Sequence, residues 1–279
     1  MSPRAVDAVL RDGIVALRDA GIPDAATDAR RLMAAVLKAT PAQLTAALRD
    51  PISPSDEGAF ADALARRLQR QPVSQIVGGR WFYGRWFKVT PDVLDPRPET
   101  ETLVDLALER PFAHVLDLGT GSGAIIVTLL AERLGATGVG TDLSEIGILV
   151  AGENAAHHGV DDRLILPVSD WWEDVGGTYD LIVSNPPYVA ADEMPSLAPE
   201  VRDWEPRLAL TDEADGLSAY RTIAAGAPDH LTAGGRLLVE IGYGQAEAVS
   251  GIFAAAGLEN IAVHTDLDGR DRVVSARRC

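Results

Sequence analysis

The spacing of apolar side chains divides the chain into regions with different predicted secondary structure. In the first region, residues 1–71, apolar positions recur at the three- and four-residue spacing of helices, which predicts helices over 6–17 and 24–39 and another after Ser53-Pro54. A serine followed by proline is typical of a helix start, because the serine caps free backbone N–H groups and the proline fits the first turn. Residues 1–71 are therefore predicted to form a small helical bundle.

Beyond residue 71 the pattern changes twice. Residues 72–95 are rich in aromatic and β-branched side chains broken by glycine and proline, which predicts a β-hairpin linker. Short apolar runs then alternate with helical patterns through residues 96–279. Strands are predicted at 114–118, 138–141, 164–168, 179–184, 235–241, 258–264 and 272–276, with helices at 124–133, 144–158, 217–230 and 245–256. This alternation is typical of a doubly wound α/β sheet, which binds ligands at the carboxyl ends of its strands.

The charge is concentrated in the second part of the chain and argues against nucleic-acid binding. Residues 1–80 hold 11 Lys and Arg against 9 Asp and Glu, and the remainder holds 14 against 32, so a net +2 is followed by −18. An acidic body of this kind repels phosphate backbones. No apolar run approaches the ~18 residues that a membrane helix needs. The single cysteine, Cys279, and the absence of ligand-like histidine spacing predict a cytoplasmic protein without a metal site.

A glycine-rich turn follows the strand at 114–118. Glycines let a backbone approach a ligand closely, and the helix that follows offers free N–H groups. An acidic residue ends the next strand, where a carboxylate can accept hydrogen bonds from ribose hydroxyls. The turn is compatible with a dinucleotide, but its early aspartate would not help a pyrophosphate. Its pattern Asp-x-Gly-x-Gly-x-Gly resembles the first motif of S-adenosylmethionine-dependent methyltransferases, which implies that the aspartate and the glycines accommodate the amino-acid end of that cofactor. The residues concerned are Asp117, Gly119, Thr120, Gly121, Ser122, Gly123 and Asp142.

The strand at 179–184 runs directly into Asn185-Pro186-Pro187-Tyr188. Two prolines fix the backbone and remove two donors, leaving carbonyl groups that only accept. The Asn185 side-chain oxygen and the Pro186 carbonyl suit the two hydrogens of a planar –NH2 group, and Tyr188 suits its flat face. Holding both N–H bonds aims the nitrogen lone pair at an incoming methyl group. The segment therefore predicts amide or amino N-methylation without a metal or a strong general base.

Together these motifs make the chain similar to the bacterial release factor glutamine methyltransferases, the PrmC/HemK family. The resemblance covers most of the chain from residue 71 onward, and Asn-Pro-Pro-Tyr alone would also suit DNA and rRNA amino methyltransferases. Its combination with Pro96-Arg97-Pro98-Glu99-Thr100-Glu101 is more specific. The other stretches that carry it are 71–78, 117–123, 169–171 and, more loosely, 201–206.

The resemblance implies a class I methyltransferase fold with a seven-stranded sheet, and transfer of a methyl group from S-adenosylmethionine to the glutamine of the Gly-Gly-Gln loop of release factors. It implies that Asp170 and Trp171 flank the adenine, that Asn185 also contacts the cofactor, and that Arg97 and Glu99 help close a glutamine pocket formed by Asn185–Tyr188. The helical region would dock the release factor. Glutamine methylation of a ribosomal protein, N-methylation of a nucleic-acid amino group, and a binding module without catalysis stay open as alternatives.

Overall fold

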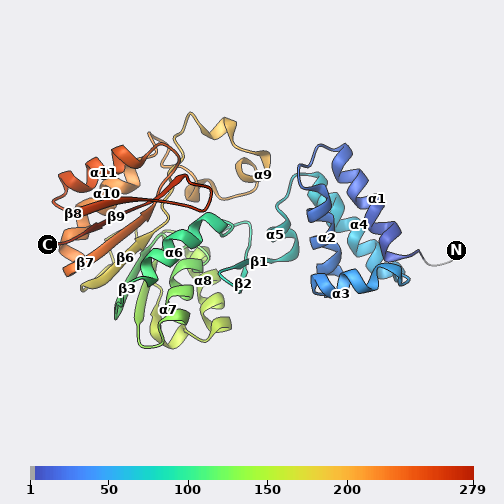
Figure 1. Ribbon diagram of the computed structural model, residues 1–279, viewed down its shortest axis with the longest axis horizontal. Helices are drawn as coiled ribbons and strands as arrows, with labels where there is room; N and C mark the ends of the chain where they lie inside the picture. The colour runs from blue at the N-terminus through green and yellow to red at the C-terminus, as the bar shows by residue number, and fades with distance from the viewer. Residues whose placement is uncertain (1–3) are drawn as a thin grey trace. The chain divides into compact units, whose positions relative to one another are not determined.

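The chain folds into two compact units. The computed structural model describes residues 4–279. One unit, the helical unit, comprises the residues up to Gly79 together with Ala198–Trp204; the other, the sheet unit, comprises Arg80–Leu197 and Glu205–Cys279. Figure 1 labels the main helices and strands of both units. The sequence-based division lay after residue 71 and assigned no later segment to the helical part.

The helical unit is built around one apolar core to which Leu17, Leu32 and Phe60 contribute fully buried side chains. Ser53 caps the fourth helix as predicted, since its hydroxyl accepts a hydrogen bond from the Asp56 backbone N–H at 3.1 Å. The elements of this unit are α1 (Val6–Asp19), α2 (Ala25–Val36), α3 (Pro41–Ala46), η1 (Ala47–Arg49), α4 (Pro54–Leu68), α5 (Val73–Val77) and α9 (Pro199–Arg202).

The short helix α5 corrects the sequence-based expectation that a hairpin begins near Val73. Pro72 precedes the first turn of the helix, and Gly78 ends it with a φ of +83°, a conformation that glycine adopts without strain. These flanking residues outweigh the strand preference of the β-branched side chains between them. The hairpin that follows is shorter, with β1 at Gly79–Phe82 and β2 at Arg85–Lys88.

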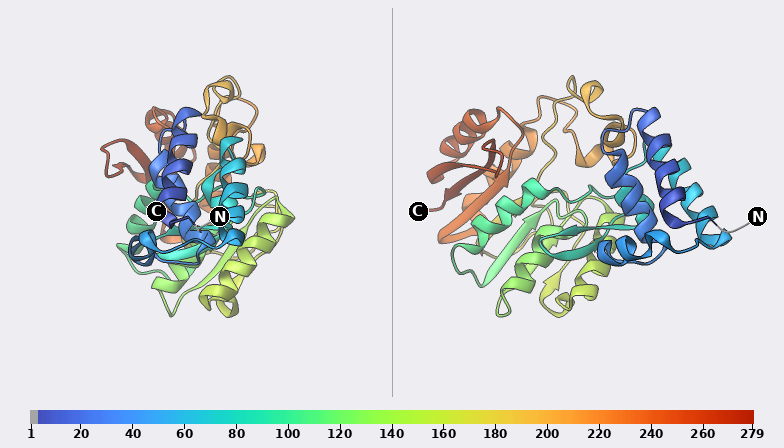
Figure 2. Two further views of the ribbon diagram at one scale, coloured as in Figure 1. Left: turned by 90° about the vertical axis from the view of Figure 1, so that its right-hand side faces the viewer. Right: turned by 45° about the vertical axis from the view of Figure 1, so that its right-hand side comes forward.

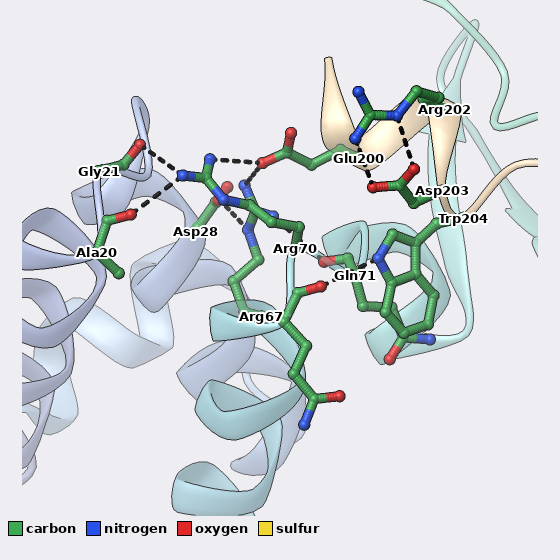
Figure 3. Close-up of polar contacts among 11 residues, drawn as sticks. Ala20, Gly21, Asp28, Arg67, Arg70, Gln71, Glu200, Arg202, Asp203 and Trp204 are labelled. Carbon is green, nitrogen blue, oxygen red and sulfur yellow. Dashed lines mark hydrogen bonds and ion pairs between the residues drawn. The ribbon is translucent and has the colours of Figure 1, made fainter. Parts of the chain in front are cut away.

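The α9 segment joins the helical unit through ion pairs, although it comes more than 100 residues later in the chain. Arg67 contacts Asp28 at 2.7 Å and Glu200 at 3.0 Å, and Arg70 contacts the same Glu200 oxygen at 3.3 Å. The Trp204 indole N–H donates to a backbone carbonyl of the helical unit at 3.1 Å. Figure 3 shows Arg67 and Arg70 pointing toward Glu200, with Trp204 to one side.

The sheet unit carries a seven-stranded sheet in the order β5-β4-β3-β6-β7-β9-β8. The first five strands are parallel, and β9 pairs antiparallel with both β7 and β8. This confirms the predicted doubly wound class and strand number. The strands are β3 (His114–Leu118), β4 (Thr137–Thr141), β5 (Leu164–Ile165), β6 (Tyr179–Ser184), β7 (Leu231–Glu240), β8 (Glu259–Thr265) and β9 (Asp271–Arg277).

Helices cover both faces of this sheet, as Figures 1 and 2 show. The helical elements are η2 (Pro98–Thr100), α6 (Glu101–Leu108), α7 (Ala124–Glu132), α8 (Glu145–His158), η3 (Asp161–Arg163), η4 (Met194–Ser196), η5 (Arg207–Ala209), α10 (Ser218–His230) and α11 (Ala246–Ala255). Alternate side chains of one strand enter different cores: Val115 packs with α6 and α7, whereas Leu116 and Leu118 pack with α10 and α11.

The parallel strands bring the chemically interesting loops to one edge of the sheet. After β3 the chain occupies β4 and β5 on one side and then crosses to β6 and β7 on the other, so the topological switch point lies between β3 and β6. Strand β5 ends at Ile165, earlier than predicted, because Pro167 lacks the N–H group that a sheet ladder needs. Val168 still makes one parallel bridge, to Asp142.

Candidate active site

A pocket lies at this carboxyl edge, entirely within the sheet unit. The loops after β3, β4 and β6 form much of it, together with the loop that precedes α6. Of the residues predicted to bind cofactor or substrate, those lining the pocket are Arg97, Gly119, Thr120, Gly121, Ser122, Asp142, Asp170, Trp171, Asn185 and Pro187. The predicted residues Glu99, Asp117, Gly123, Pro186 and Tyr188 are not among its lining residues.

The glycine turn forms an open cradle. Gly119 and Gly121 have φ values of +72° and +54°, and a Cβ added at either position would meet no heavy atom within 4 Å. The backbone at these positions therefore faces free space in which a ligand can come close. Gly123 differs, because its Cβ would lie 3.1 Å from the Ala151 side chain, so this glycine serves the packing of α7 against α8.

Asp117 is fully buried at the end of β3. The Thr120 hydroxyl donates to its Oδ2 at 2.7 Å, whereas its Oδ1, also buried, has no hydrogen-bond partner within residues 4–279. Burial raises the pKa of the carboxyl to about 7, and the Thr120 hydrogen bond only partly opposes this. A buried acceptor without a partner costs free energy, so the site favours a ligand that donates a hydrogen bond there.

Asp142 ties two of the pocket loops together. Its Oδ2 accepts the Gly121 backbone N–H and its Oδ1 accepts the Ser144 backbone N–H, both at 2.8 Å. Burial raises the pKa of this carboxyl, and the backbone hydrogen bonds oppose the rise. The sequence predicts a contact between Asp142 and ribose hydroxyls, and in the structure the same carboxylate also holds the glycine turn in place.

Asp170 and Trp171 lie on the opposite loop of the pocket, after β5. Trp171 is half-buried and has a φ of +49°, which is uncommon for a residue with a side chain. Ser169 stabilises this turn, since its hydroxyl donates to the Trp171 carbonyl at 3.2 Å and accepts the Asp174 N–H at 3.0 Å. The loop thus places an indole ring and a carboxylate at the pocket.

Asn185 shows a second unpartnered acceptor. Its Nδ2 donates to the Thr100 hydroxyl at 3.3 Å, and that hydroxyl donates to Glu240 Oε2 at 2.6 Å. The Asn185 Oδ1 is shielded from solvent and has no partner in the described part of the chain. Asn185 therefore has an amide oxygen available for an N–H donor, which is the chemistry that the Asn-Pro-Pro-Tyr segment predicts.

The Tyr188 side chain packs against the apolar core that includes α10 and α11. Burial raises the pKa of its hydroxyl to about 12, and the nearby Glu240 carboxylate adds to the rise. The Tyr188 carbonyl accepts a hydrogen bond from Gln245 Nε2 at 2.9 Å. The predicted contact between this ring and a planar acceptor group stays a prediction.

Arg97 is paired in a way that the sequence analysis missed. Its Nη2 donates to both carboxylate oxygens of the buried Glu205, at 2.6 and 2.7 Å. Burial raises the pKa of Glu205 to about 7, against the opposing charge of Arg97. The pair lies beside the pocket wall that Pro206 and Leu208 continue.

Comparison with known proteins decides the family. The model of the PrmC N-terminal domain matches residues 8–78, and that of the methyltransferase small domain matches residues 95–200. A release factor glutamine methyltransferase of Cereibacter sphaeroides is 60% identical over 274 residues, covering 98% of each chain. One of Rhodospirillum rubrum is 41% identical, over 97% of this chain and 84% of the relative.

The chain belongs to the release factor glutamine methyltransferase family.

Solved structures agree with the methyltransferase fold of this family. A methyltransferase from Pyrococcus furiosus has a TM-score of 0.56 at 16% identity, covering 78% of this chain and 99% of that chain. The catalytic domain of hMettl16 has a TM-score of 0.60 at 14% identity, with 77% and 81% covered. As a member of the release factor glutamine methyltransferase family, the protein is an S-adenosylmethionine-dependent enzyme. The dinucleotide interpretation of the glycine turn is thereby set aside.

Two features are absent from the described part of this methyltransferase. No group of three or more His, Cys, Asp or Glu side chains within residues 4–279 is arranged to hold a metal ion. Among the same residues, no helix combines the length and the apolar character that crossing a membrane requires.

Proposed function

We propose that this protein transfers the methyl group of S-adenosylmethionine to the side-chain amide nitrogen, N5, of the glutamine in the Gly-Gly-Gln loop of peptide chain release factors. The relatives that match nearly the whole chain are named for glutamine methylation of release factors. The observation that carries the proposal is Asn185, a pocket residue with a shielded amide oxygen for which residues 4–279 provide no donor.

The pocket residues fit the cofactor together with Asp117, which accepts a hydrogen bond from the pocket residue Thr120. The cradle at Gly119 and Gly121 has free space for a ligand, and Asp117 Oδ1 lacks a donor that an amino group would supply. We assign the amino-acid end of the cofactor to Asp117 and the turn at 119–123, the ribose to Asp142, and the adenine to Asp170 and Trp171. Asn185 closes the cofactor site where it meets the substrate.

The remaining residues act on the substrate. A carboxamide nitrogen is a weak nucleophile because its lone pair is delocalised. Asn185 Oδ1 and the Pro186 carbonyl each accept one N–H of the glutamine amide, which directs the lone pair and stabilises the positive charge that develops on nitrogen. The cofactor would supply a sulfonium-activated methyl group, whose S–CH3 bond breaks as the N–CH3 bond forms, with S-adenosyl-L-homocysteine as the leaving product. The nitrogen loses its extra proton to water after transfer, so no strong base is needed beforehand.

Further residues and the helical unit complete the binding of the substrate. Pro187 and Tyr188 complete the glutamine site, with Arg97 and Glu99 at its rim. The helical unit docks the release factor. The acidic balance of residues 81–279 supports a protein rather than a nucleic acid as substrate. A metal-free active site and a cytoplasmic setting complete the proposal.

Cofactor affinity should increase with pH as Asp117 loses its proton. With a pKa of about 7, this carboxyl is about 9% ionised at pH 6 and about 50% ionised at pH 7. Only the carboxylate attracts the ammonium group of the cofactor, so the association constant should rise about fivefold between these pH values, with proton release. Calorimetry in buffers of different ionisation enthalpy measures the association constant and the number of protons released. In Asp117→Asn the pH dependence should disappear; a wild-type affinity independent of pH would contradict the assignment.

The direct test is methyl transfer from labelled S-adenosylmethionine to purified bacterial release factors. Each factor is assayed beside a variant in which alanine replaces the loop glutamine, and ribosomal proteins and rRNA are assayed in parallel. We expect label in the intact factor and none in the glutamine variant. Label in a ribosomal protein or RNA, with none in the release factor, would overturn the proposed acceptor.

A further inference from the structure

The proposed reaction requires one particular orientation of the Asn185 side chain. The two ends of an asparagine amide have nearly the same shape, but only the oxygen accepts an N–H donor. If the amide turned over, its NH2 group would meet the NH2 group of the substrate glutamine, and neither could accept. Some contact must therefore favour one orientation over the other, and Asn185 itself cannot supply it.

The contacts that set this orientation come from two other elements. Thr100 ends η2 and Glu240 ends β7, and both side chains are buried. The Thr100 hydroxyl has a single proton, which it donates to Glu240 Oε2 at 2.6 Å. Only its lone pairs are left for Asn185, so Asn185 must present Nδ2, which it does at 3.3 Å. The amide oxygen is then left for another donor.

We propose that Thr100 and Glu240 are positioning residues that fix the Asn185 amide with its oxygen available to the substrate. This inference rests on the proposed function, because it explains how the chain prepares the acceptor atom that the reaction uses. The full chain of contacts runs from the Glu240 carboxylate through the Thr100 hydroxyl to Asn185 Nδ2. Residues 4–279 offer Asn185 Oδ1 no competing donor.

The charge of Glu240 controls the direction of the hydrogen bonds that link it through Thr100 to Asn185. As a carboxylate, Glu240 can only accept, which commits the Thr100 proton to it. If protonated, it can donate to Thr100, whose own proton is then free to bond Asn185 Oδ1 and favour the wrong orientation. Burial raises the pKa of Glu240 to about 7, opposed by the Thr100 hydrogen bond and the positive charge of Arg272.

The other groups that act electrostatically with Glu240 are Arg97, Glu99, Tyr188 and Tyr220. Arg97 favours the carboxylate and Glu99 opposes it, while the hydroxyls of Tyr188 and Tyr220 have pKa values raised above their usual value by burial. With the cofactor at saturating concentration, so that Asp117 does not limit turnover, kcat is expected to fall below about pH 7 as the Asn185 amide loses its fixed orientation.

The test compares Thr100→Val, which removes the hydroxyl, with Thr100→Ser, which keeps it. We expect Thr100→Val to lower kcat on the release factor at least tenfold, with cofactor Kd and substrate KM changed less than about threefold. Thr100→Ser should stay within about threefold of wild type. A structural role alone would lower the melting temperature without separating kcat from KM.

A second measurement does not depend on the acceptor. The side-chain NH2 signals of Asn185, identified by their loss in Asn185→Ala, should exchange slowly with solvent in wild type and Thr100→Ser and faster in Thr100→Val. Glu240→Gln, which can donate a hydrogen bond to Thr100, should lose the decline of kcat below pH 7. This variant tests the inference if Thr100→Val does not fold.

The outcomes separate the two proposals. If release factors are not methylated but the Asn185 protection depends on Thr100, the positioning inference stands and the proposed acceptor is wrong. If release factors are methylated equally by Thr100→Val and wild type, and Asn185 is equally protected in both, the positioning inference is overturned while the proposed function stands.

Discussion

Replacing Asn185 with alanine should lower turnover on release factors by about 100-fold or more while changing the cofactor Kd only a few-fold. The variant removes the shielded amide oxygen that has no partner in the described chain. The substrate glutamine can still enter, but one of its N–H bonds is no longer held, so its lone pair is not aimed at the methyl group. The loss should therefore appear in kcat more than in cofactor binding.

Single-turnover methylation and equilibrium cofactor binding separate the possible roles of Asn185. A parallel loss of cofactor affinity would mean that Asn185 mainly holds the cofactor, and unchanged turnover would refute our account of the site. Asn260→Ala is a suitable control, because the same substitution is made on β8, and Asn260 does not line the active-site pocket. Its turnover should match that of wild type.

Local patterns were enough to predict the elements that position the site. The strands β3 and β6 lie where the apolar runs at 114–118 and 179–184 predicted them. Each run is short, buried and followed at once by a turn that cannot continue a strand: a glycine turn in one case and two prolines in the other. The order of these motifs along the chain then placed them at one edge of the sheet.

The contacts that organise the site were not predictable in the same way. Thr100 and Glu240 are 140 residues apart, and Arg97 and Glu205 are 108 apart. A single sequence contains no local signal for such pairs, since each residue alone resembles an ordinary exposed polar residue. For Glu205 a partial signal existed, because it lies in the 201–206 stretch that resembles the family. For Glu240 the only signal was its place at the end of a predicted buried strand.

The α9 segment was missed for the same reason. Residues 198–204 fall between two elements of the sheet unit in sequence, yet their ion pairs join them to the helical unit. The segment also separates Asn185–Tyr188 from the pocket residues Pro206 and Leu208 along the chain.

Replacing Arg67 with methionine should destabilise the helical unit by about 3 kcal/mol or more, since breaking a buried ion pair leaves a carboxylate without its cation. The Arg67 side chain is 7% exposed, and its partners Asp28 and Glu200 are 10% and 20% exposed. Methionine fills a similar volume but offers no N–H donor. Glu200 keeps its contact with Arg70, whereas no other ion pair is formed by Asp28 in the described chain.

Urea unfolding followed by circular dichroism gives the free energy of unfolding. Hydrogen exchange of peptides from α2 and α4 shows whether the loss of stability lies within the helical unit. The matched control is Arg11→Met, which makes the same substitution in an exposed ion pair. In that pair the Arg11 side chain is 70% exposed and the Asp7 side chain is 45% exposed. An exposed pair of this kind contributes about 0.5 kcal/mol or less, so the control should stay near wild type. If Arg67→Met is no less stable than Arg11→Met, the ion pairs do not anchor the α9 segment, and its place in the helical unit must depend on the Trp204 contacts instead.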